Sequence, residues 1–411
     1  MRLPVTLACV VLSGLWQGAR AAPDPADPAA ACVCADPDAP AAAPRDKLTL
    51  TKAKFSDLPG WTDDKLAEAV PSFLNSCAVI AGLKDTDPMG HDGHGGKAGQ
   101  WRKACAAAAR VKPGDDAGAR AMFEAEFVAW SAAGKAGTEG KLTGYNVQQI
   151  RASRKKGGKF QIPIYDRPKD LVMIDLSKHI PDAHGRRIWG KLDAKGEVAP
   201  YPTRAEIRKG ALAGQNLELM YADDATDVLF AHIEGSAKAI MDDGSVVWLE
   251  FAGKNGRAYR GVGGVLKSMG ELQAPGSGTM QGIRKWFVEH PGKFDEVVDQ
   301  SSSFVFFRES TKAGAVGSQM VLLTPQRSMA IDRAFIAQST PIFVETRAPI
   351  VGQPGAAPWR QLLIAQDTGG GILGPVRGDI YWGDDLAAAE RGGRMGGPGK
   401  YWLLLPKGVG K

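Results

Sequence analysis

The stretch DTGGGILGPVRGDIYWG, residues 367–383, joins two predicted strands through a glycine-rich turn. One strand, Leu362–Ala365, precedes the stretch, and the other, Ile380–Trp382, lies near its end. Further short strands are predicted on both sides, at 304–307, 320–323, 342–345 and 401–405. Strands and tight turns spaced this closely predict a closed β-barrel in the last third of the chain.

Asp379 is the strongest catalytic candidate in this stretch. In a strand its side chain shares a face with Tyr381, whereas Ile380 and Trp382 point to the other face. Burial beside apolar neighbours disfavours the charged carboxylate, so Asp379 is expected to have a raised pKa and a proton to donate. A sugar ring can stack on an aromatic neighbour such as Tyr381.

Two other aspartates, Asp367 and Asp332, also border predicted strands. Aspartates at strand ends commonly form turns, so the pattern alone leaves the catalytic and the turn-forming interpretation open. Asp367 also begins an Asp-Thr-Gly sequence like that of aspartic proteases, but the chain has no second copy of it to complete a catalytic pair.

The part of the chain before the barrel is predicted to change from helical to β structure. Helices are predicted in the segment 58–136, at 65–74, 101–111 and 117–130. After Lys141 short strands follow, at 160–165, 239–240 and 246–251, and two helices interrupt them, at 262–269 and 279–290. Thr279 is the expected N-cap of the last helix.

The beginning of the chain predicts export. Arg2, the apolar run Leu3–Leu15 and the small-residue site ending at Ala21 are typical of a signal peptide, 1–21. The Ala-, Pro- and Asp-rich segment 22–45 is typical of a flexible leader. Cys9 follows Leu7 and Ala8, which leaves a lipoprotein signal as the alternative. In an oxidising compartment, Cys77 and Cys105 are the expected disulfide.

Composition limits the class of protein. The chain has 411 residues, of which 44% are hydrophobic and 23% charged, with a net charge of +6. It is therefore expected to be globular, with two domains, and its mild basicity suits an anionic polymer without proving one. The loop 90–94 holds two histidines and an aspartate but too few ligands for a metal site. No phosphate loop or nucleophile elbow is present.

Several segments together resemble the membrane-bound lytic murein transglycosylase A family, whose C-terminal module is named for three aspartates. They occur in one order from about Lys141 to Lys407, at 142–145, 203–207, 252–260, 305–308, 323–328 and 367–383. The resemblance implies a mainly β fold with an N-terminal helical segment: a double-psi β-barrel with a smaller β domain inserted in it. It divides the chain into a helical part of the large domain (46–142), the smaller β domain (143–310) and the barrel (311–411).

The resemblance also assigns roles to residues. Asp379 takes the position of the family's catalytic acid, with Asp367 as its hydrogen-bonding neighbour. Substrate contacts are expected in a groove between the domains, whereas Asp332 is expected chiefly to organise the barrel. The substrate-binding candidates are Thr143, Tyr145, Glu234, Ser236, Asp332 and Tyr381. The chain departs from the family pattern at Asn146, Glu234, Ala237 and Leu373.

The implied activity is cleavage of the β-1,4 bond between N-acetylmuramic acid and N-acetylglucosamine in peptidoglycan, with formation of 1,6-anhydromuramic acid ends. One aspartic acid suffices, because the sugar's own C6 hydroxyl attacks C1 in place of water. No cofactor, metal, nucleotide or nucleic acid is expected, and the enzyme is expected to be a monomer in the periplasm of a Gram-negative bacterium, with association with the outer membrane left open. The alternatives are a weakly active or non-catalytic glycan-binding protein of the same fold and a β-1,4-glucan hydrolase.

Overall fold

The computed structural model describes residues 46–91, 93–180, 187–274 and 276–409. The predicted signal peptide (1–21) and leader (22–45), with Cys9, Cys32 and Cys34, lie outside the described residues. Every helix within the described ranges is too short or too polar to span a bilayer.

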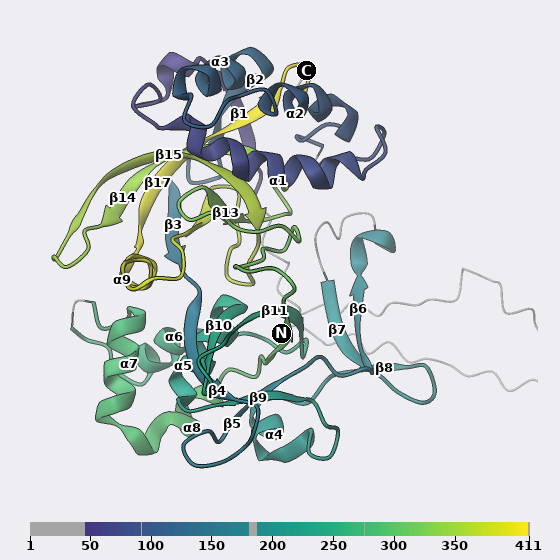
Figure 1. Ribbon diagram of the computed structural model, residues 1–411, viewed down its shortest axis with the longest axis vertical. Coiled ribbons are helices and arrows are strands. Elements are labelled where there is room, and N and C mark those ends of the chain that lie inside the picture. Colours follow the sequence, from purple (N-terminus) through teal and green to yellow (C-terminus); the bar gives the residue numbers. More distant parts are fainter. Residues whose placement is uncertain (1–45, 92, 181–186, 275, 410–411) are drawn as a thin grey trace, which may run out of the picture. The chain divides into compact units, whose positions relative to one another are not determined.

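The larger sheet forms a closed barrel with a two-strand extension (Figure 1). Its strands are β1 (Thr49–Ala53), β2 (Phe127–Ala133), β3 (Gly140–Tyr145), β13 (Ser328–Ile331), β14 (Pro341–Pro349), β15 (Ala356–Asp367), β16 (Arg377–Tyr381) and β17 (Gly396–Pro406). The order is β1-β2-β17-β14-β15-β13-β16-β3, and β17 also pairs with β3, which closes the ring. The predicted mainly β fold with a closed barrel is therefore confirmed.

Close packing inside the barrel determines where β16 lies. All four residues of β13 are buried, and so are Leu362–Gln366 in the second half of β15. Gly378 lies directly against Met329, because a Cβ atom on it would come within 1.8 Å of the Met329 side chain. Glycine leaves room for the Met329 side chain here, and the pairing of β16 with β13 sets Asp379 opposite Ala330.

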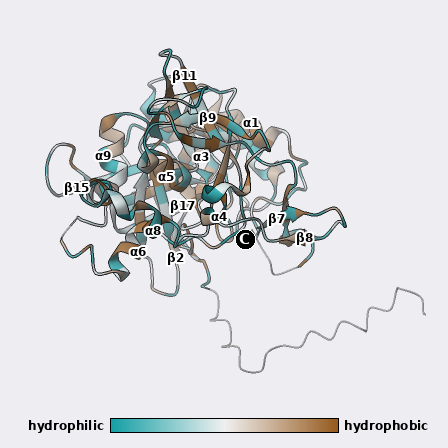
Figure 2. Ribbon diagram, turned by 90° about the horizontal axis from the view of Figure 1, so that it is seen from below, coloured by the Kyte–Doolittle hydropathy of each residue, from teal (hydrophilic) through white to brown (hydrophobic). Residues whose placement is uncertain are grey.

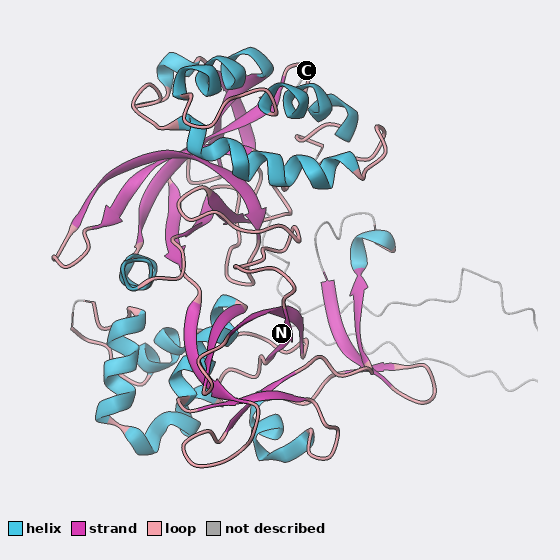
Figure 3. Cartoon of the chain, in the orientation of Figure 1, coloured by secondary structure: helices cyan, strands magenta, loops and turns pink. Residues whose placement is uncertain are grey.

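Helices near the N-terminus cover one side of the barrel (Figure 3). They are α1 (Val70–Ala81), α2 (Arg102–Ala108) and α3 (Asp116–Glu126), with short 3-10 helices at Phe55–Asp57, Leu66–Ala69 and Ala98–Trp101. Their core is aromatic: the Phe73 ring lies 6.2 Å from the Phe123 ring and 5.7 Å from the Phe127 ring, measured between centroids. The Cys77–Cys105 disulfide joins α1 to α2.

Two predicted elements are wrong, one after these helices and one between β12 and β13. The helix predicted over Ala117–Trp130 ends at Glu126, because the following residues form β2 and pair with β1 and β17. The segment 58–136 is therefore not entirely helical. The strand predicted over Met320–Leu323 is a loop with one isolated bridge, and Met320 has a φ of 64°, which interrupts an extended strand.

The second sheet has six strands in the order β12-β11-β10-β4-β9-β5. They are β4 (Gln148–Ser153), β5 (Ile162–Tyr165), β9 (Glu218–Ala222), β10 (Ser236–Met241), β11 (Val246–Lys254) and β12 (Val305–Glu309). A single bridge between Asp166 and Phe307 links the two edges, so this sheet is nearly a closed barrel. The predicted strands at 160–165, 239–240, 246–251 and 304–307 all lie in it.

Helices pack on the second sheet and beside it. They are α4 (Arg204–Glu206), the adjoining π-helix Ile207–Ala211, α5 (Ala225–Glu234), α6 (Val262–Ser268), α7 (Met280–Glu289) and α8 (Phe294–Val298). Hydrophobic and hydrophilic residues both occur along the helices, as the colours of Figure 2 show. The predicted N-cap of α7 is confirmed, because Thr279 Oγ1 accepts the Gly282 N–H at 3.1 Å.

A small third sheet and one further helix complete the described structure. The sheet contains β6 (Leu171–Asp175), β7 (Arg187–Leu192) and β8 (Val198–Ala199), and the short helices Leu176–Lys178 and Pro291–Lys293 lie at chain turns. Helix α9 (Leu386–Arg394) packs against β3.

The chain passes from the barrel to the second sheet between Tyr145 and Gln148, and it returns after Glu309. The second sheet is therefore an insertion in the sequence of the barrel. The smaller domain was predicted to start at residue 143, but Thr143 and Tyr145 still pair with β16 in the barrel. Both therefore approach the candidate site from the barrel side.

Candidate active site

Asp379 lies in β16 and meets β3 across a parallel pairing. The register places Asp379 beside Thr143 and Tyr381 beside Tyr145. Thr143 Oγ1 donates a hydrogen bond of 2.6 Å to Asp379 Oδ1. The two strands thus bring four of the predicted site residues together, although more than 230 positions separate Thr143 from Asp379 in the sequence.

Burial raises the pKa of Asp379 to about 6, and the negative charge of Asp367 adds to this rise. The Thr143 hydrogen bond and the positive charges of Arg377 and Lys141 act in the opposite direction. Desolvation wins because it penalises the ionised form more than these partners stabilise it. Asp379 can therefore hold a proton near neutral pH and release it without a large cost.

Asp367 ends β15 and is surrounded by donors. Its Oδ1 accepts the Ser318 N–H and its own neighbour's N–H, that of Thr368, each at 2.8 Å. Its Oδ2 accepts the Tyr145 hydroxyl at 2.9 Å. Burial raises the pKa of Asp367 above its usual value, and these donated hydrogen bonds offset part of that rise. Three donors favour the carboxylate form, which has only acceptors to offer.

The two tyrosines of the site, Tyr145 and Tyr381, pack against each other. The Tyr145 and Tyr381 rings lie 5.4 Å apart between centroids, and both side chains are buried. Burial, with the Asp367 charge, raises the pKa of Tyr145 well above its usual value, so its hydroxyl remains a donor. Ile380 and Trp382 belong to the main barrel core on the other side of the strand, which confirms the predicted alternation.

Glu234 and Ser236 lie at the end of α5 and the start of β10. Burial raises the pKa of Glu234 well above its usual value, and the charges of Asp379 and Asp367 raise it further. The inserted sheet thus carries a third carboxyl group toward the aspartate pair. Ser236 is buried and pairs with Glu250 of β11.

Asp332 has a different setting. Its Oδ1 accepts the Ala334 N–H at 2.9 Å, and its Oδ2 accepts the Gly374 N–H at 2.8 Å. Both oxygens therefore hold backbone turns of the barrel, as a strand-end aspartate does.

Three contributors to the site were not predicted from the sequence: the Ser318 N–H, Arg377 and Lys141. Arg377 stands two residues before Asp379 in one strand, so strand alternation could have placed both on one face. Ser318 carried no comparable signal, because its contact with Asp367 depends on how a distant loop folds. Within the described ranges, no group of His, Cys, Asp and Glu is placed to hold a metal ion.

Two family models match the chain. The model described as the MltA specific insert domain matches residues 141–308, which contain the second and third sheets. The model of the 3D domain matches residues 327–405, which contain β13 to β16 and most of β17, with Asp367 and Asp379.

A curated relative is the membrane-bound lytic murein transglycosylase A of Escherichia coli K12, 32% identical over 269 residues. The match covers 64% of this chain and 65% of that protein, so it spans less than two thirds of the relative's length. A crystal structure of E. coli MltA with bound chitohexaose matches with a TM-score of 0.58 and 25% identity, covering 87% of this chain and 94% of that one.

Two further solved structures are similar. The membrane-bound lytic murein transglycosylase of Agrobacterium tumefaciens matches with a TM-score of 0.75 and 29% identity, covering 87% of this chain and 98% of that one. The lytic transglycosylase LtgG of Burkholderia pseudomallei matches with a TM-score of 0.56 and 34% identity, covering 89% of this chain and 98% of that one.

Proposed function

The chain belongs to the membrane-bound lytic murein transglycosylase A family, and we propose that it cleaves the glycan strands of peptidoglycan. The bond cleaved is the β-1,4 bond between N-acetylmuramic acid and N-acetylglucosamine, and the product ends in 1,6-anhydromuramic acid. The observation that carries this proposal is the half-buried Asp379 carboxyl, whose pKa is raised to about 6, beside Asp367, which accepts several hydrogen bonds.

In the proposed reaction Asp379 acts first as an acid and then as a base. Its carboxyl proton goes to the glycosidic oxygen as the bond from that oxygen to C1 breaks. The C6 hydroxyl oxygen of the muramic acid then bonds to C1, and its proton returns to the Asp379 carboxylate. Atoms and charges balance without water, so a second carboxylate to activate water is not needed.

Asp367 serves this reaction as the fixed negative neighbour. Its hydrogen-bond donors favour its ionised form against the burial that raises its pKa, and its charge favours the protonated form of Asp379. Tyr145 orients Asp367, and Thr143 orients Asp379, through the hydrogen bonds that their hydroxyls donate.

The substrate is proposed to meet the aspartates from the side of the inserted sheet. Glu234 and Ser236 are the proposed contacts there, and Tyr381 and Thr143 are those of the barrel. The relative crystallised with chitohexaose binds a β-1,4-linked amino-sugar chain, which supports a glycan strand as ligand. Export to the periplasm, with residues 1–21 as signal peptide, and the double-psi topology of the barrel belong to the same proposal.

The test uses purified murein sacculi and mass spectrometry of the released muropeptides. The mature protein is expected to release products lighter by one water than hydrolysis products. Asp379→Asn is expected to lower the rate on the order of a thousandfold, because a positioned general acid contributes about 10²- to 10⁴-fold. Asp242→Asn, at an exposed turn, is the matched control and should match the wild type.

Other outcomes separate the alternatives. Products with reducing ends would identify a hydrolase, which would overturn the proposed reaction. Intact murein with the wild-type protein, together with retention of the protein on the sacculi, would identify a glycan-binding protein instead.

A further inference from the structure

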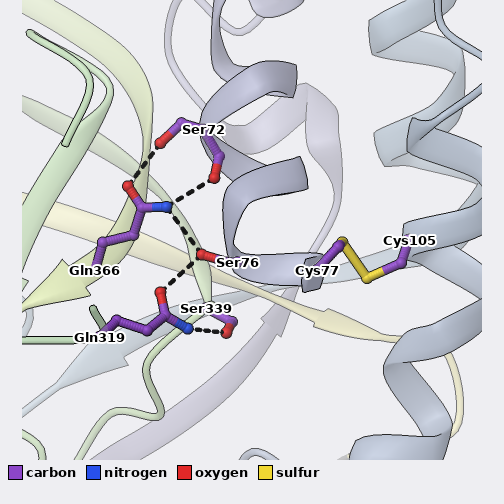
Figure 4. Close-up of a disulfide and its surroundings, with 7 residues drawn as sticks. All are labelled: Ser72, Ser76, Cys77, Cys105, Gln319, Ser339 and Gln366. Atoms are coloured by element: carbon purple, nitrogen blue, oxygen red, sulfur yellow. Dashed lines mark hydrogen bonds between the residues drawn. A yellow bond between two sulfur atoms is a disulfide. The ribbon is translucent and has the colours of Figure 1, made fainter. Parts of the chain in front are cut away.

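A buried polar network joins helix α1 to the loop and strand that hold Asp367 (Figure 4). Ser76 and Gln366 are fully buried, and Gln319 is 8% exposed. Polar side chains at such depth cost free energy unless every group is paired, and apolar residues would fill the same space more cheaply. Their presence here calls for a reason other than stability.

Ser76 is the centre of the network. Its hydroxyl donates to Gln319 Oε1 at 2.8 Å and accepts from Gln366 Nε2 at 2.9 Å. Gln366 Nε2 also donates to the Ser72 carbonyl at 2.7 Å, one turn earlier in α1. Gln319 Nε2 donates to Ser339 Oγ at 2.5 Å. Gln366 Oε1 accepts the Ser72 hydroxyl at 2.8 Å, so the amides of both glutamines are held through their nitrogen and their oxygen.

Each glutamine is the chain neighbour of a group in the active site. Gln366 directly precedes Asp367, and Gln319 directly follows Ser318, whose N–H donates to Asp367 Oδ1. The Gln319 N–H also donates to the Gln366 carbonyl at 3.1 Å, which ties the loop to the strand. Ser76 thus contacts the sequence neighbour of each partner in the hydrogen bond between Ser318 and Asp367.

Helix α1 is itself anchored next to Ser76. The following residue, Cys77, is bonded to Cys105 of α2, with the two Cα atoms 5.6 Å apart. Figure 4 shows the disulfide on the opposite side of α1 from the glutamines. The helix is therefore a fixed support for the network.

We propose that Ser76, Gln319 and Gln366 are positioning residues that hold the Ser318 N–H on Asp367 and so keep Asp367 the ionised partner of Asp379. This inference rests on the proposed function for its catalytic meaning. Among the hydrogen bonds of the described residues, none joins one of these three side chains to the carboxyl group of Asp367 or Asp379. The three residues therefore act through Ser318 and the backbone of β15.

The charges around the pair define what the network can change. Asp367 faces Tyr145, Asp379 and Glu234, and it accepts hydrogen bonds from the N–H groups of Ser318 and Thr368 and from the Ser318 side chain. Asp379 faces Asp367, Glu234 and the cations Arg377 and Lys141. Loss of the network would leave all of these groups in place except Ser318. Its loss weakens the stabilisation of the Asp367 carboxylate and raises the pKa of Asp367.

The test compares Ser76→Ala and Gln319→Leu with Ser301→Ala, each in the full mature protein. Ser301 is a buried serine of the inserted part whose hydroxyl accepts the Arg260 N–H, far in sequence from this network, so it controls for the loss of one buried hydroxyl. Two readouts are used: the pH profile of kcat/KM on murein, and a carboxyl 13C NMR titration of Asp367.

Ser76→Ala and Gln319→Leu are expected to raise the titration midpoint of Asp367 by about half to one pH unit, on the scale of one lost hydrogen bond. The acidic limb of the activity profile should move to higher pH by a similar amount, with KM unchanged. Ser301→Ala should leave both where they are. A lower melting temperature with an unmoved Asp367 titration would overturn the proposal and leave the network a purely structural role.

The two readouts keep this inference separate from the proposed function. If the wild-type protein forms no anhydro products, the proposed function fails, and the 13C titration still decides whether Ser76 and Gln319 control Asp367. If the products form but the titration of Asp367 is the same in all variants, only the positioning role fails.

Discussion

At the scale of single residues, the two aspartates differ in their hydrogen-bond donors, and this difference predicts their behaviour with pH. Thr143 donates to Asp379, which lowers the pKa of that carboxyl. Thr143→Val should therefore raise the pKa of Asp379. Since the reaction begins with protonated Asp379, the alkaline limb of the kcat/KM profile should move up by about half to one pH unit.

Tyr145→Phe acts on the other carboxyl. It removes the donor to Asp367 Oδ2, so the pKa of Asp367 should rise and the acidic limb should move to higher pH, while the alkaline limb moves less. Measured together, the two profiles assign the limbs. If Thr143→Val moved only the acidic limb, Asp379 would not be the group that gives up the proton.

The raised pKa of Asp379 also predicts a change in stability. Its pKa is about 6 in the folded protein against an ordinary value of 3.8, so ionising it in place costs folding free energy. The cost is absent below pH 3.8, grows as the pH rises, and is complete above about pH 6. Asp379→Asn should therefore stabilise the protein by about 1–2 kcal/mol at pH 7.5, after allowance for partial exposure, and by nothing near pH 3.5. Urea unfolding at both pH values measures this; equal effects at both would contradict the buried-acid assignment.

Strand alternation was enough to predict from the sequence that Asp379 and Tyr381 share a face, because that pattern is local. The Ser318 contact and the approach of Glu234 to the aspartates could not be derived in this way. Both depend on segments that meet only after the barrel closes and the inserted sheet folds.

At the scale of elements, the predicted short strands are found except the one at 320–323, and one helix was predicted too long. The residues Phe127–Trp130 continue the apolar spacing of α3, yet they form β2, because pairing with β17 buries Phe127 and Ala129 in the barrel. Burial against neighbouring strands of a sheet can outweigh the helical preference of a local sequence pattern. The strand predicted at 320–323 is a loop, and this loop bonds to a segment distant in sequence: the Ser318 N–H donates to Asp367, and the Gln319 N–H donates to the Gln366 carbonyl.

The disulfide gives an element-scale prediction. Cys77 and Cys105 close a separation of 28 residues between α1 and α2. The replacement of both by serine should lower the free energy of unfolding by about 3–4 kcal/mol, mainly because the unfolded chain regains freedom. Urea unfolding of the double variant and of the oxidised wild type measures the difference. Reductant should lower the unfolding midpoint of the wild type but not that of the double variant, which identifies the disulfide as the source of the difference. A double variant with the same midpoint as the oxidised wild type would contradict the prediction.

At the scale of the whole molecule, the proposed reaction needs the inserted sheet to hold Glu234 near the aspartates of the barrel, whose charges act on it. Polar contacts between the two parts lie close to α9. Lys238 of β10 forms an ion pair of 2.7 Å with Asp384, whose carbonyl accepts the Gln149 Nε2 at 2.6 Å. Gln281 of α7 donates to the Ala389 carbonyl at 2.9 Å.

Lys238→Met should therefore impair catalysis more than stability. Methionine keeps a side chain of similar length but removes the ammonium group, which pairs with Asp384 and lies over the Trp248 ring, 5.4 Å from its centroid. A partly exposed ion pair contributes only about 0–1 kcal/mol to folding, whereas a shift of about 1 Å between substrate and acid can cost up to about a hundredfold in rate. We expect kcat/KM on murein to fall about tenfold with the melting temperature nearly unchanged. Lys285→Met removes a more exposed ion pair on α7, with Glu289, and should leave both values as in the wild type. Equal activity of the two variants would mean that other contacts suffice to align the inserted sheet with Asp379.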